Sequence, residues 1–426
     1  MGRVGRRLVR RRTPKRSSPV LAIATLLGFL SGCGRFGYDL EGIGVDDANA
    51  NDGSPPDGGP SDGMGRLIDG KSSGVVFPDG EVRVSRAPGR SLHPALAWTG
   101  KELLVVWDDQ RSGNQDIYLA SLPANGEPVA VRLTDDSAQS GFPNAAWASE
   151  HNHLAVAWED NRDGNAEIYF GRFGRDGSPF GELRATNTPA ESYDPSIVWN
   201  GSEHGIAYHE GSPSQTSIRL QRVGSDGASI GKASTLSRGS GLAQFASLTW
   251  TGQDYGVAWQ DNRDGPLEVY FGRVDPNGGP VNKEVEVSTS GGGVWFLSLT
   301  WSGSEYGVAW ADARNGGQLA IFFSRLGTDG TKLADDDVQL SKGGGDAKDP
   351  SVAWIGNGYA VAWDQGGEIR YAVLDTSGKI VKAVQPVSTG KGASEPTVAW
   401  LGDRIAVAWH DTRHGEEEIY VRVLAP

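Results

Sequence analysis

Residues 246–270, ASLTWTGQDYGVAWQDNRDGPLEVY, contain the pattern that decides the fold. A short alternating run ends in Trp250, a glycine-bearing turn follows, and a second run ends in Trp259. An Asp-x-Arg-x-Gly turn then leads into a third run that ends in Tyr270. Short alternating runs separated by glycine turns predict a meander of antiparallel strands.

The same pattern occurs seven times along the chain, and a Trp ends the first run of every repeat. These residues are Trp98, Trp147, Trp199, Trp250, Trp301, Trp354 and Trp400. A second Trp ends the second run in six repeats, and Tyr208 takes its place in the third. An Asn-Gly, Asp-Gly or Ser-Gly dipeptide after the third run of six repeats predicts a tight turn into a fourth strand. A period of about fifty residues with four strands is typical of a β-propeller blade.

The two ends of the repeat region indicate how the ring closes. The last repeat ends at Pro426 after its third run, whereas a spare run, residues 81–85 (EVRVS), precedes the first repeat. This run is nearly identical to the fourth run at residues 284–288 (EVEVS). We therefore expect the N-terminal strand to complete the last blade and remove an open sheet edge. The predicted fold is an all-β, seven-bladed propeller of four-stranded blades over residues 76–426.

The first 32 residues predict an export signal. Eight Lys and Arg residues without any acidic residue precede an apolar run from Val20 to Leu30. Residues 30–33, Leu-Ser-Gly-Cys, resemble the lipobox of bacterial lipoproteins, and Cys33 is the only cysteine. The resemblance implies cleavage before Cys33, lipidation of its thiol and anchoring in the membrane by acyl chains. Because Gly34 replaces the Asp that often retains such lipoproteins at the inner membrane, we expect an outer-membrane location in the cell envelope, on its periplasmic or surface face.

Composition constrains the linker and the partners. Residues 33–75 are rich in Gly, Asp and Pro, which predicts a disordered, flexible linker between Cys33 and the propeller. The chain carries a formal net charge of −13, and removal of the signal makes the mature protein more acidic. Since such a surface repels phosphate backbones, nucleic acid is not expected as a partner. We expect a monomer without a cofactor or a bound metal.

Five repeats carry the Asp-x-Arg-x-Gly turn between the second and third runs. Its Asp and Arg residues are Asp109 and Arg111, Asp160 and Arg162, Asp261 and Arg263, Asp312 and Arg314, and Asp411 and Arg413. With the Glu-Ile-Tyr at residues 167–169, this turn resembles the propeller repeat of TolB-type proteins over most of residues 81–426. The longer period and the absence of a visible second domain depart from that family. We interpret the motif as structural, with the Asp accepting turn hydrogen bonds and the Arg pairing with an acid; a ring of Asp side chains that binds cations or sugars is the alternative.

Candidate binding residues occur where the repeat varies. The third repeat replaces the turn motif with a segment that begins His209-Glu210, and the sixth shortens it after Asp364. The loops before the first strand carry an aromatic or imidazole ring in five repeats. The predicted ligand-binding rim at the mouth of the central channel is His93, Phe142, Tyr193, His209, Glu210, Phe245, Trp295 and Asp364. Such rings stack on a sugar or clamp a peptide, or else they fill the gap between blades.

These observations predict a lipid-anchored, non-catalytic propeller that binds a protein or a glycan, or serves as a scaffold, at the cell envelope. No nucleophile and base occur at a recognisable spacing, so no catalytic residue is assigned. The alternative is a glycan-active hydrolase or lyase of propeller fold, in which carboxyl groups such as those of Glu210 and Asp364 converge in one pocket.

Overall fold

The computed structural model describes residues 77–78, 80–123, 127–314 and 316–426. The predicted signal peptide, the lipidation site Cys33 and the predicted linker lie outside the described residues. The described residues form 28 strands arranged in seven antiparallel four-stranded sheets, and none of them forms an apolar helix long enough to span a membrane. The prediction of seven four-stranded blades is therefore confirmed.

Each blade is a meander whose strands are called a to d in order from the central axis outward. Blade 1 contains β2 (Ser91–Trp98), β3 (Leu103–Asp109), β4 (Asp116–Leu122) and β5 (Val131–Arg132). Blade 2 contains β6 (Ser140–Ala148), β7 (His153–Asp160), β8 (Glu167–Phe173) and β9 (Pro179–Arg184). Blade 3 contains β10 (Glu191–Trp199), β11 (Glu203–Ser212), β12 (Gln215–Gly224) and β13 (Ser229–Thr235). Blade 4 contains β14 (Ala243–Trp250), β15 (Tyr255–Asp261), β16 (Glu268–Val274) and β17 (Val285–Glu286).

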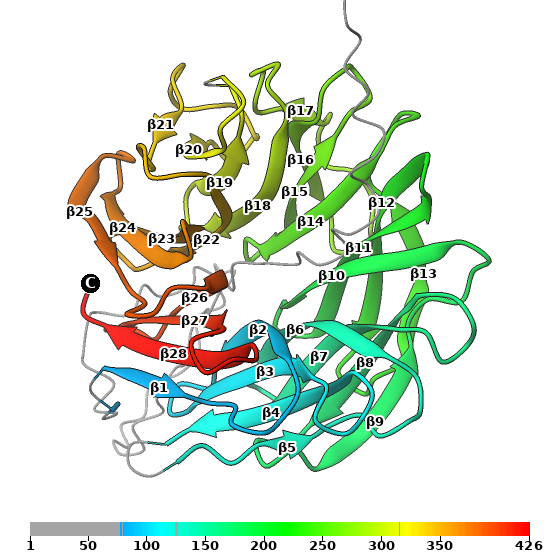
Figure 1. Cartoon of the computed structure of the whole chain (residues 1–426). Helices are drawn as coiled ribbons and strands as arrows, with labels where there is room; N and C mark the ends of the chain where they lie inside the picture. The colour runs from blue at the N-terminus through cyan, green and yellow to red at the C-terminus, as the bar shows by residue number, and fades with distance from the viewer. Residues whose placement is uncertain (1–76, 79, 124–126, 315) are drawn as a thin grey trace, which may run out of the picture. The chain divides into compact units, whose positions relative to one another are not determined.

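The remaining blades follow the same plan. Blade 5 contains β18 (Val294–Trp301), β19 (Tyr306–Asp312), β20 (Ala320–Leu326) and β21 (Val338–Gln339). Blade 6 contains β22 (Ala347–Trp354), β23 (Gly358–Gln365), β24 (Glu368–Asp375) and β25 (Ile380–Pro386). Blade 7 contains β26 (Ala393–Trp400), β27 (Ile405–Asp411), β28 (Glu418–Leu424) and, as its outer strand, β1 (Glu81–Arg83). Each strand a contacts the strands a of both neighbouring blades, so these seven strands surround the axis (Figure 1).

The closure joins the two ends of the described chain. Strand β1 pairs antiparallel with β28, and Val82 lies opposite Val421 (Figure 1, blue strand beside red). The ladder continues past β1, because the Val84 backbone N–H donates to the Ile419 carbonyl oxygen at 2.7 Å. An ion pair between Glu81 and Arg413 adds to this contact. The prediction that the N-terminal strand completes the last blade is confirmed.

Strand b forms the buried middle of the blades because neighbouring blades cover both of its faces. In blades 1, 4, 5, 6 and 7 it is buried along its whole length. The Trp that ends its apolar run is fully buried in six blades, and Tyr208 is buried at the same place in blade 3. The two regularly spaced Trp positions of the sequence thus mark the packing between blades, where apolar area is removed from water.

A polar contact closes the interface between some adjacent blades at the turns between strands a and b. Glu203 accepts hydrogen bonds from Arg222 of its own blade at 2.6 and 2.7 Å and from the Tyr255 hydroxyl of the next blade at 3.2 Å. The other two interfaces of this kind use Glu305, Arg325 and Tyr359, and Asp254, Arg273 and Tyr306.

Between blades 2 and 3, two histidines take the places of the acid and the tyrosine. The Nε2 atoms of His153 and His204 lie 3.2 Å apart, and the Trp199 ring packs on His204 at 4.6 Å. Burial and the charge of Arg172 lower the pKa of His153 to about 4, and burial lowers the pKa of His204 well below its usual value. Both imidazoles are therefore neutral at pH 7.

Candidate ligand-binding ring

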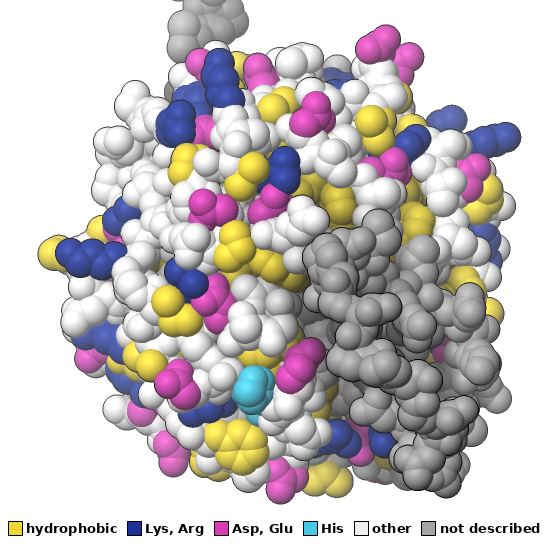
Figure 2. Space-filling view, turned by 180° about the vertical axis from the view of Figure 1, so that it is seen from behind, with side chains coloured by type: hydrophobic (Ala, Val, Ile, Leu, Met, Phe, Trp, Pro, Cys, Tyr) yellow, Lys and Arg dark blue, Asp and Glu magenta, His cyan; other side chains and the backbone are white. Residues whose placement is uncertain are grey.

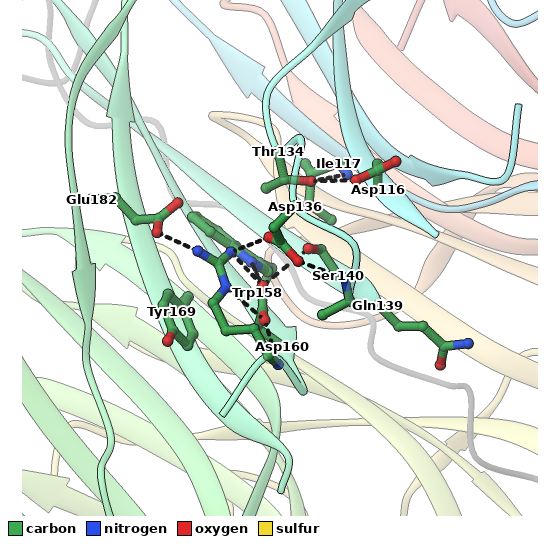
Figure 3. A network of polar contacts seen from close by, with 12 residues as sticks. Asp116, Ile117, Thr134, Asp136, Gln139, Ser140, Trp158, Asp160, Tyr169 and Glu182 are labelled. Atoms are coloured by element: carbon green, nitrogen blue, oxygen red, sulfur yellow. Dashed lines mark hydrogen bonds and ion pairs between the residues drawn. The ribbon is translucent and has the colours of Figure 1, made fainter. Parts of the chain in front are cut away.

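The Asp-x-Arg turn joins strand b to neighbouring segments through one carboxylate. Asp160 accepts hydrogen bonds from Trp158 Nε1 at 2.9 Å, from the Arg162 backbone N–H at 3.0 Å and from the Ser140 hydroxyl at 3.0 Å (Figure 3). The Arg162 guanidinium also pairs with Glu182 of the same blade and with Asp136 of the segment before it. Burial alone would raise the pKa of Asp160, but the bonds from Arg162 and Trp158 hold it below its usual value.

The equivalent residues in the other four blades make the same contacts. In each, the Asp accepts from the Trp two residues before it and from the backbone N–H of the Arg two residues after it. The guanidinium also covers an aromatic ring of strand c, for example Tyr169 at 4.2 Å from Arg162 Cζ. Since these contacts occupy the carboxylates within the blades, they support the structural interpretation of the motif over a ring of free Asp side chains.

One residue in the strand a of every blade has a left-handed backbone although it is not glycine. These seven residues, here called the axial ring, are His93, Phe142, Asp194, Phe245, Phe296, Asp349 and Glu395, with φ between 50° and 55°. In each blade the pairing of strands a and b shifts register at or beside this residue, as in a β-bulge. This conformation costs about 1 kcal/mol or more for a bulky residue, and such strain concentrates at functional sites.

Contacts between blades show that the axial ring surrounds one end of the axis. His93 Nε2 lies 3.5 Å from a carboxylate oxygen of Glu395 in blade 7, and the His93 ring lies 4.0 Å from the Phe142 ring in blade 2. On the other side, the rings of Phe245 and Phe296 lie 6.0 Å apart. The backbone conformation is constant around the ring, and the bulges place seven side chains of four kinds around one end of the axis.

A second layer of side chains supports the axial ring from strand b. This backing layer is the residue that follows the strand b Trp or Tyr in each blade: Asp108, Glu159, His209, Gln260, Ala311, Asp364 and His410. Asp108 lies 2.5 Å from His93 Nδ1, and the Asp194 backbone N–H donates to Glu159 at 2.7 Å. His410 Nδ1 lies 3.7 Å from the Glu395 carboxylate.

Burial and neighbouring carboxylates change the protonation of this layer. Burial and the charge of Asp349 raise the pKa of Asp364 to about 7, although Ser394 donates to its carboxylate at 2.6 Å and Lys348 lies 3.4 Å away. Burial and the charge of Asp194 raise the pKa of Glu159 well above its usual value. Burial lowers the pKa of His209 to about 3. At neutral pH the layer therefore contains an Asp364 carboxyl group close to its pKa and a neutral His209 imidazole.

Two stretches of the axial ring differ in chemistry, and Phe142 and Asp194 lie between them. Blades 6, 7 and 1 contribute Asp349, Glu395 and His93, and we call this part the acidic arc together with Asp364 and Asp108 behind it. Blades 4 and 5 contribute the half-buried rings of Phe245 and Phe296, here called the aromatic arc. No three His, Cys, Asp or Glu side chains are placed to hold a metal ion anywhere in the described part of the chain.

The predicted rim residues divide among three places. His93, Phe142 and Phe245 belong to the axial ring, and His209 and Asp364 belong to the backing layer. Tyr193 and Trp295 lie one residue before the ring members Asp194 and Phe296, and Glu210 pairs with Arg219 at 2.9 Å. The placement of the five rings in loops is wrong, because each lies inside a strand a. Strand a begins several residues before the run that the sequence pattern identifies. Its pairing with strand b is interrupted at the bulge and continues on the N-terminal side of it.

Four members of the axial ring escaped the sequence analysis: Asp194, Phe296, Asp349 and Glu395. A signal for them exists, because every ring member lies five residues before the Trp that ends strand a. The sequence analysis looked for an aromatic or imidazole ring near the start of strand a and not for a fixed position. It therefore selected Tyr193 and Trp295 beside the ring members Asp194 and Phe296, and it selected neither Asp349 nor Glu395.

Charged side chains of both signs are mixed on the part of the described surface that one view shows. In the face drawn in Figure 2, Lys and Arg side chains are interspersed with Asp and Glu, and apolar side chains are scattered among them. A hollow on the outer part of blade 4 is lined by both signs of charge, including Arg238, Lys283 and Glu286. The axial ring, by comparison, brings acidic and aromatic side chains together around the axis.

Comparison with known proteins shows a likeness in structure without a likeness in sequence. No family model matches the chain, and no curated protein matches it. The α-L-arabinofuranosidase of Fusarium graminearum in complex with arabinobiose superposes with a TM-score of 0.50 at 11% identity, covering 82% of this chain and 98% of that chain. The shared feature is the fold.

Two further solved structures resemble the chain less closely. An oligogalacturonate lyase in complex with manganese gives a TM-score of 0.48 at 13% identity and covers 80% of this chain and 99% of that chain. TolB from Acinetobacter baumannii gives 0.42 at 15% identity and covers 72% and 66%. At such identities, likeness to an arabinofuranosidase, a lyase and TolB favours neither a binding function nor a catalytic one.

Proposed function

We propose that this protein is a lipid-anchored propeller of the cell envelope that binds a glycan at the axial ring without transforming it. The observation that carries the proposal is that half-buried aromatic rings and buried carboxyl groups lie in the same ring around one end of the axis. The lipobox-like sequence ending at Cys33 supports the anchor, and the long Gly, Asp and Pro segment after it supports a tethered propeller.

A sugar has chemistry that matches both parts of the ring. Its C–H faces pack on aromatic rings, which supply contact area at a small cost in conformational entropy, and its hydroxyl groups donate to carboxylates. Phe245 and Phe296 offer aromatic rings for the C–H faces of a sugar. Asp349 and Glu395 offer carboxylates for its hydroxyl groups.

The glycan-binding proposal is tested by an array of oligosaccharides, followed by calorimetry with the best binder. Phe245→Ala and Phe296→Ala are each expected to weaken binding about tenfold, because a stacked aromatic ring contributes about 1 kcal/mol or more. Phe180→Ala is the matched control, since Phe180 lies on the outer strand β9 and is 52% exposed. Equal losses in all three variants would contradict a site at the axial ring.

A glycan-active hydrolase or lyase is the second candidate, and one observation favours it. His93 lies between Asp108 and Glu395, and the pKa of Asp364 is about 7 beside Asp349. A carboxyl group that titrates near the working pH suits a general acid. Turnover of the bound oligosaccharide that Asp364→Asn abolishes without loss of binding would establish this alternative; intact oligosaccharide after long incubation supports the non-catalytic proposal.

The anchor is tested separately through Cys33. In a bacterial host that processes lipoproteins, the wild-type protein is expected in the membrane fraction with acyl chains on Cys33 by mass spectrometry. Cys33→Ala is expected to release the protein from that fraction or leave its signal uncleaved. An unmodified Cys33 in a membrane-free protein would contradict the anchor.

A further inference from the structure

We propose that the propeller rests on the lipid bilayer through a rim of apolar side chains at the end opposite the axial ring. This basal rim is the residue three positions after the glycine of the turn between strands c and d, in the six blades that have this turn. Its members are Val129, Phe180, Ile230, Val281, Leu333 and Val381. The inference rests on the proposed lipid anchor and adds the surface that faces the membrane.

The first support is that exposure and apolar character coincide at this one position. In the described part of the chain, every large apolar side chain that is exposed belongs to the basal rim: Val129 at 76%, Phe180 at 52%, Val281 at 44%, Leu333 at 47% and Val381 at 60%. The sixth member, Ile230, is half-buried. Single exposed apolar residues scattered over a surface are ordinary, whereas their restriction to one position of the repeat indicates a common partner.

The sequence around the rim shows the same restriction. The residue before the rim member is Pro, Ser, Lys or Ile, and the residue after it is Ala, Gly, Asn or Lys. The rim position itself is Val, Phe, Ile or Leu in all six blades. An outer strand that faced only water would accept polar residues at this position as readily as at its neighbours.

Strand pairing places the basal rim at the end of the propeller opposite the axial ring. In blade 4, Trp250 at the end of strand a lies opposite Tyr255, which lies opposite Val274 at the end of strand c. The turn from strand c to strand d therefore lies at the end where strand a finishes. The axial ring member Phe245 lies five residues earlier on strand a, toward the other end.

The chain enters the propeller at the same end as the basal rim. Phe77, the first described residue, packs on Trp98 at the end of strand a of blade 1, with ring centroids 5.9 Å apart. Glu81, the first residue of β1, lies opposite Arg422 near the end of β28 (Figure 1). Blade 7 has no turn between strands c and d, so the entering chain takes the place that a rim member has in the other six blades. The predicted linker from Cys33 therefore joins the propeller beside the rim.

A bilayer suits this arrangement because it is extended and flat. Strands d, such as β9, β13 and β25, form the outer margin of the ring, and each rim member lies on a different blade (Figure 1). A partner that contacts several members at once must therefore span the whole base. A flexible linker of the predicted length has a root-mean-square span of about 35 Å, so the anchor keeps the base near the bilayer and weak contacts suffice. Docking in this orientation directs the axial ring away from the membrane.

Apolar contact, and not charge, is expected to drive the docking. The chain has a formal net charge of −13, so an anionic lipid surface does not attract it. The turns beside the rim contain acidic side chains that are already engaged. Asp176 accepts hydrogen bonds from Ser178, and Asp329 accepts hydrogen bonds from Thr331. We therefore expect docking on zwitterionic lipid, with little dependence on salt.

Fluorescence quenching by nitroxide-labelled lipid tests the orientation of the anchored protein. The mature lipoprotein is reconstituted in phosphatidylcholine vesicles with an environment-sensitive fluorophore on one introduced thiol, since acylation blocks Cys33. In Phe180→Cys the fluorophore is expected to lie against lipid and to lose about half of its emission. Asn187→Cys is the matched control, because Asn187 is exposed beyond the opposite end of β9, and little loss is expected there. Equal quenching in the two variants, or none in Phe180→Cys, would overturn the proposal.

Sedimentation with vesicles separates the rim from the anchor. The mature chain, residues 33–426, with Cys33→Ser is expected to bind phosphatidylcholine vesicles weakly and equally at low and high salt. Adding Phe180→Ser and Leu333→Ser is expected to weaken this binding at least tenfold, because two exposed apolar side chains no longer enter lipid. Adding Asn187→Ser is the control and is expected to leave binding unchanged.

The outcomes distinguish the rim from the anchor and from a second copy of the chain. Unchanged vesicle binding after Phe180→Ser and Leu333→Ser would overturn the rim. An unmodified Cys33 in the wild type would contradict the anchor, and the sedimentation result would still decide the rim. A dimer that forms without lipid and dissociates after the same two changes would also overturn the proposal, because a second copy would then cover the rim.

Discussion

Val84→Asp is expected to lower the free energy of unfolding by about 3–5 kcal/mol, because it places an unpaired charge inside the closure of the ring. Val84 is 4% exposed, and it follows β1 and lies in the same apolar cluster as Val421 of β28. Its backbone N–H continues the ladder to Ile419. Urea denaturation followed by Trp fluorescence measures the effect, since many of the tryptophans lie between blades.

The matched control places the same charge on another blade edge. Val381 lies on β25, the outer strand of blade 6, and is 60% exposed. Val381→Asp is expected to change the free energy of unfolding by less than about 0.5 kcal/mol. If the two variants unfold at the same urea concentration, the N-terminal strand does not hold the last blade in place.

The double variant His153→Glu, His204→Tyr is expected to remove much of the acid sensitivity of the protein. The variant introduces the acid and the tyrosine that three other interfaces between blades contain. Arg172 of the wild type already supplies the arginine. In the wild type the folded pKa of His153, about 4, lies below the unfolded value of 6.5. The associated stability is therefore present above pH 6.5 and is lost as the pH falls toward 4, in total about 3 kcal/mol for His153 alone.

Urea denaturation at several pH values between 7 and 4 measures this effect. The wild type is expected to lose stability steeply over that range, and the double variant is expected to lose less. His414→Gln is the control, because His414 is exposed on the turn of blade 7. If the double variant and the control lose stability in parallel with the wild type, the pair His153 and His204 does not determine the acid response.

The architecture was predictable because its signals are local and repeated. Trp250 and Trp259 report the packing of strands a and b, and six further copies of the pattern fix the number of blades. The closure was predictable because residues 81–85 nearly repeat residues 284–288 while the last repeat ends after its third strand. In both cases the signal is a sequence pattern that can be recognised by comparing one part of the chain with another.

The axial ring was only partly predictable because its geometry arises from the pairing of two strands. A left-handed φ at Phe245 or Glu395 contradicts the local preference of those residues, and only the bulge against strand b imposes it. The contact between His153 and His204 was hidden for another reason. The two residues are 51 positions apart, and nothing in either segment shows that they meet between blades.

A crystal structure of the protein with the oligosaccharide selected by the array tests the central claim most directly. The account predicts the sugar at the end of the axis, with one face on Phe245 or Phe296 and a polar group directed toward Asp349 and Glu395. A sugar bound in the hollow of blade 4 beside Arg238 and Lys283, with the axial ring empty, would contradict it.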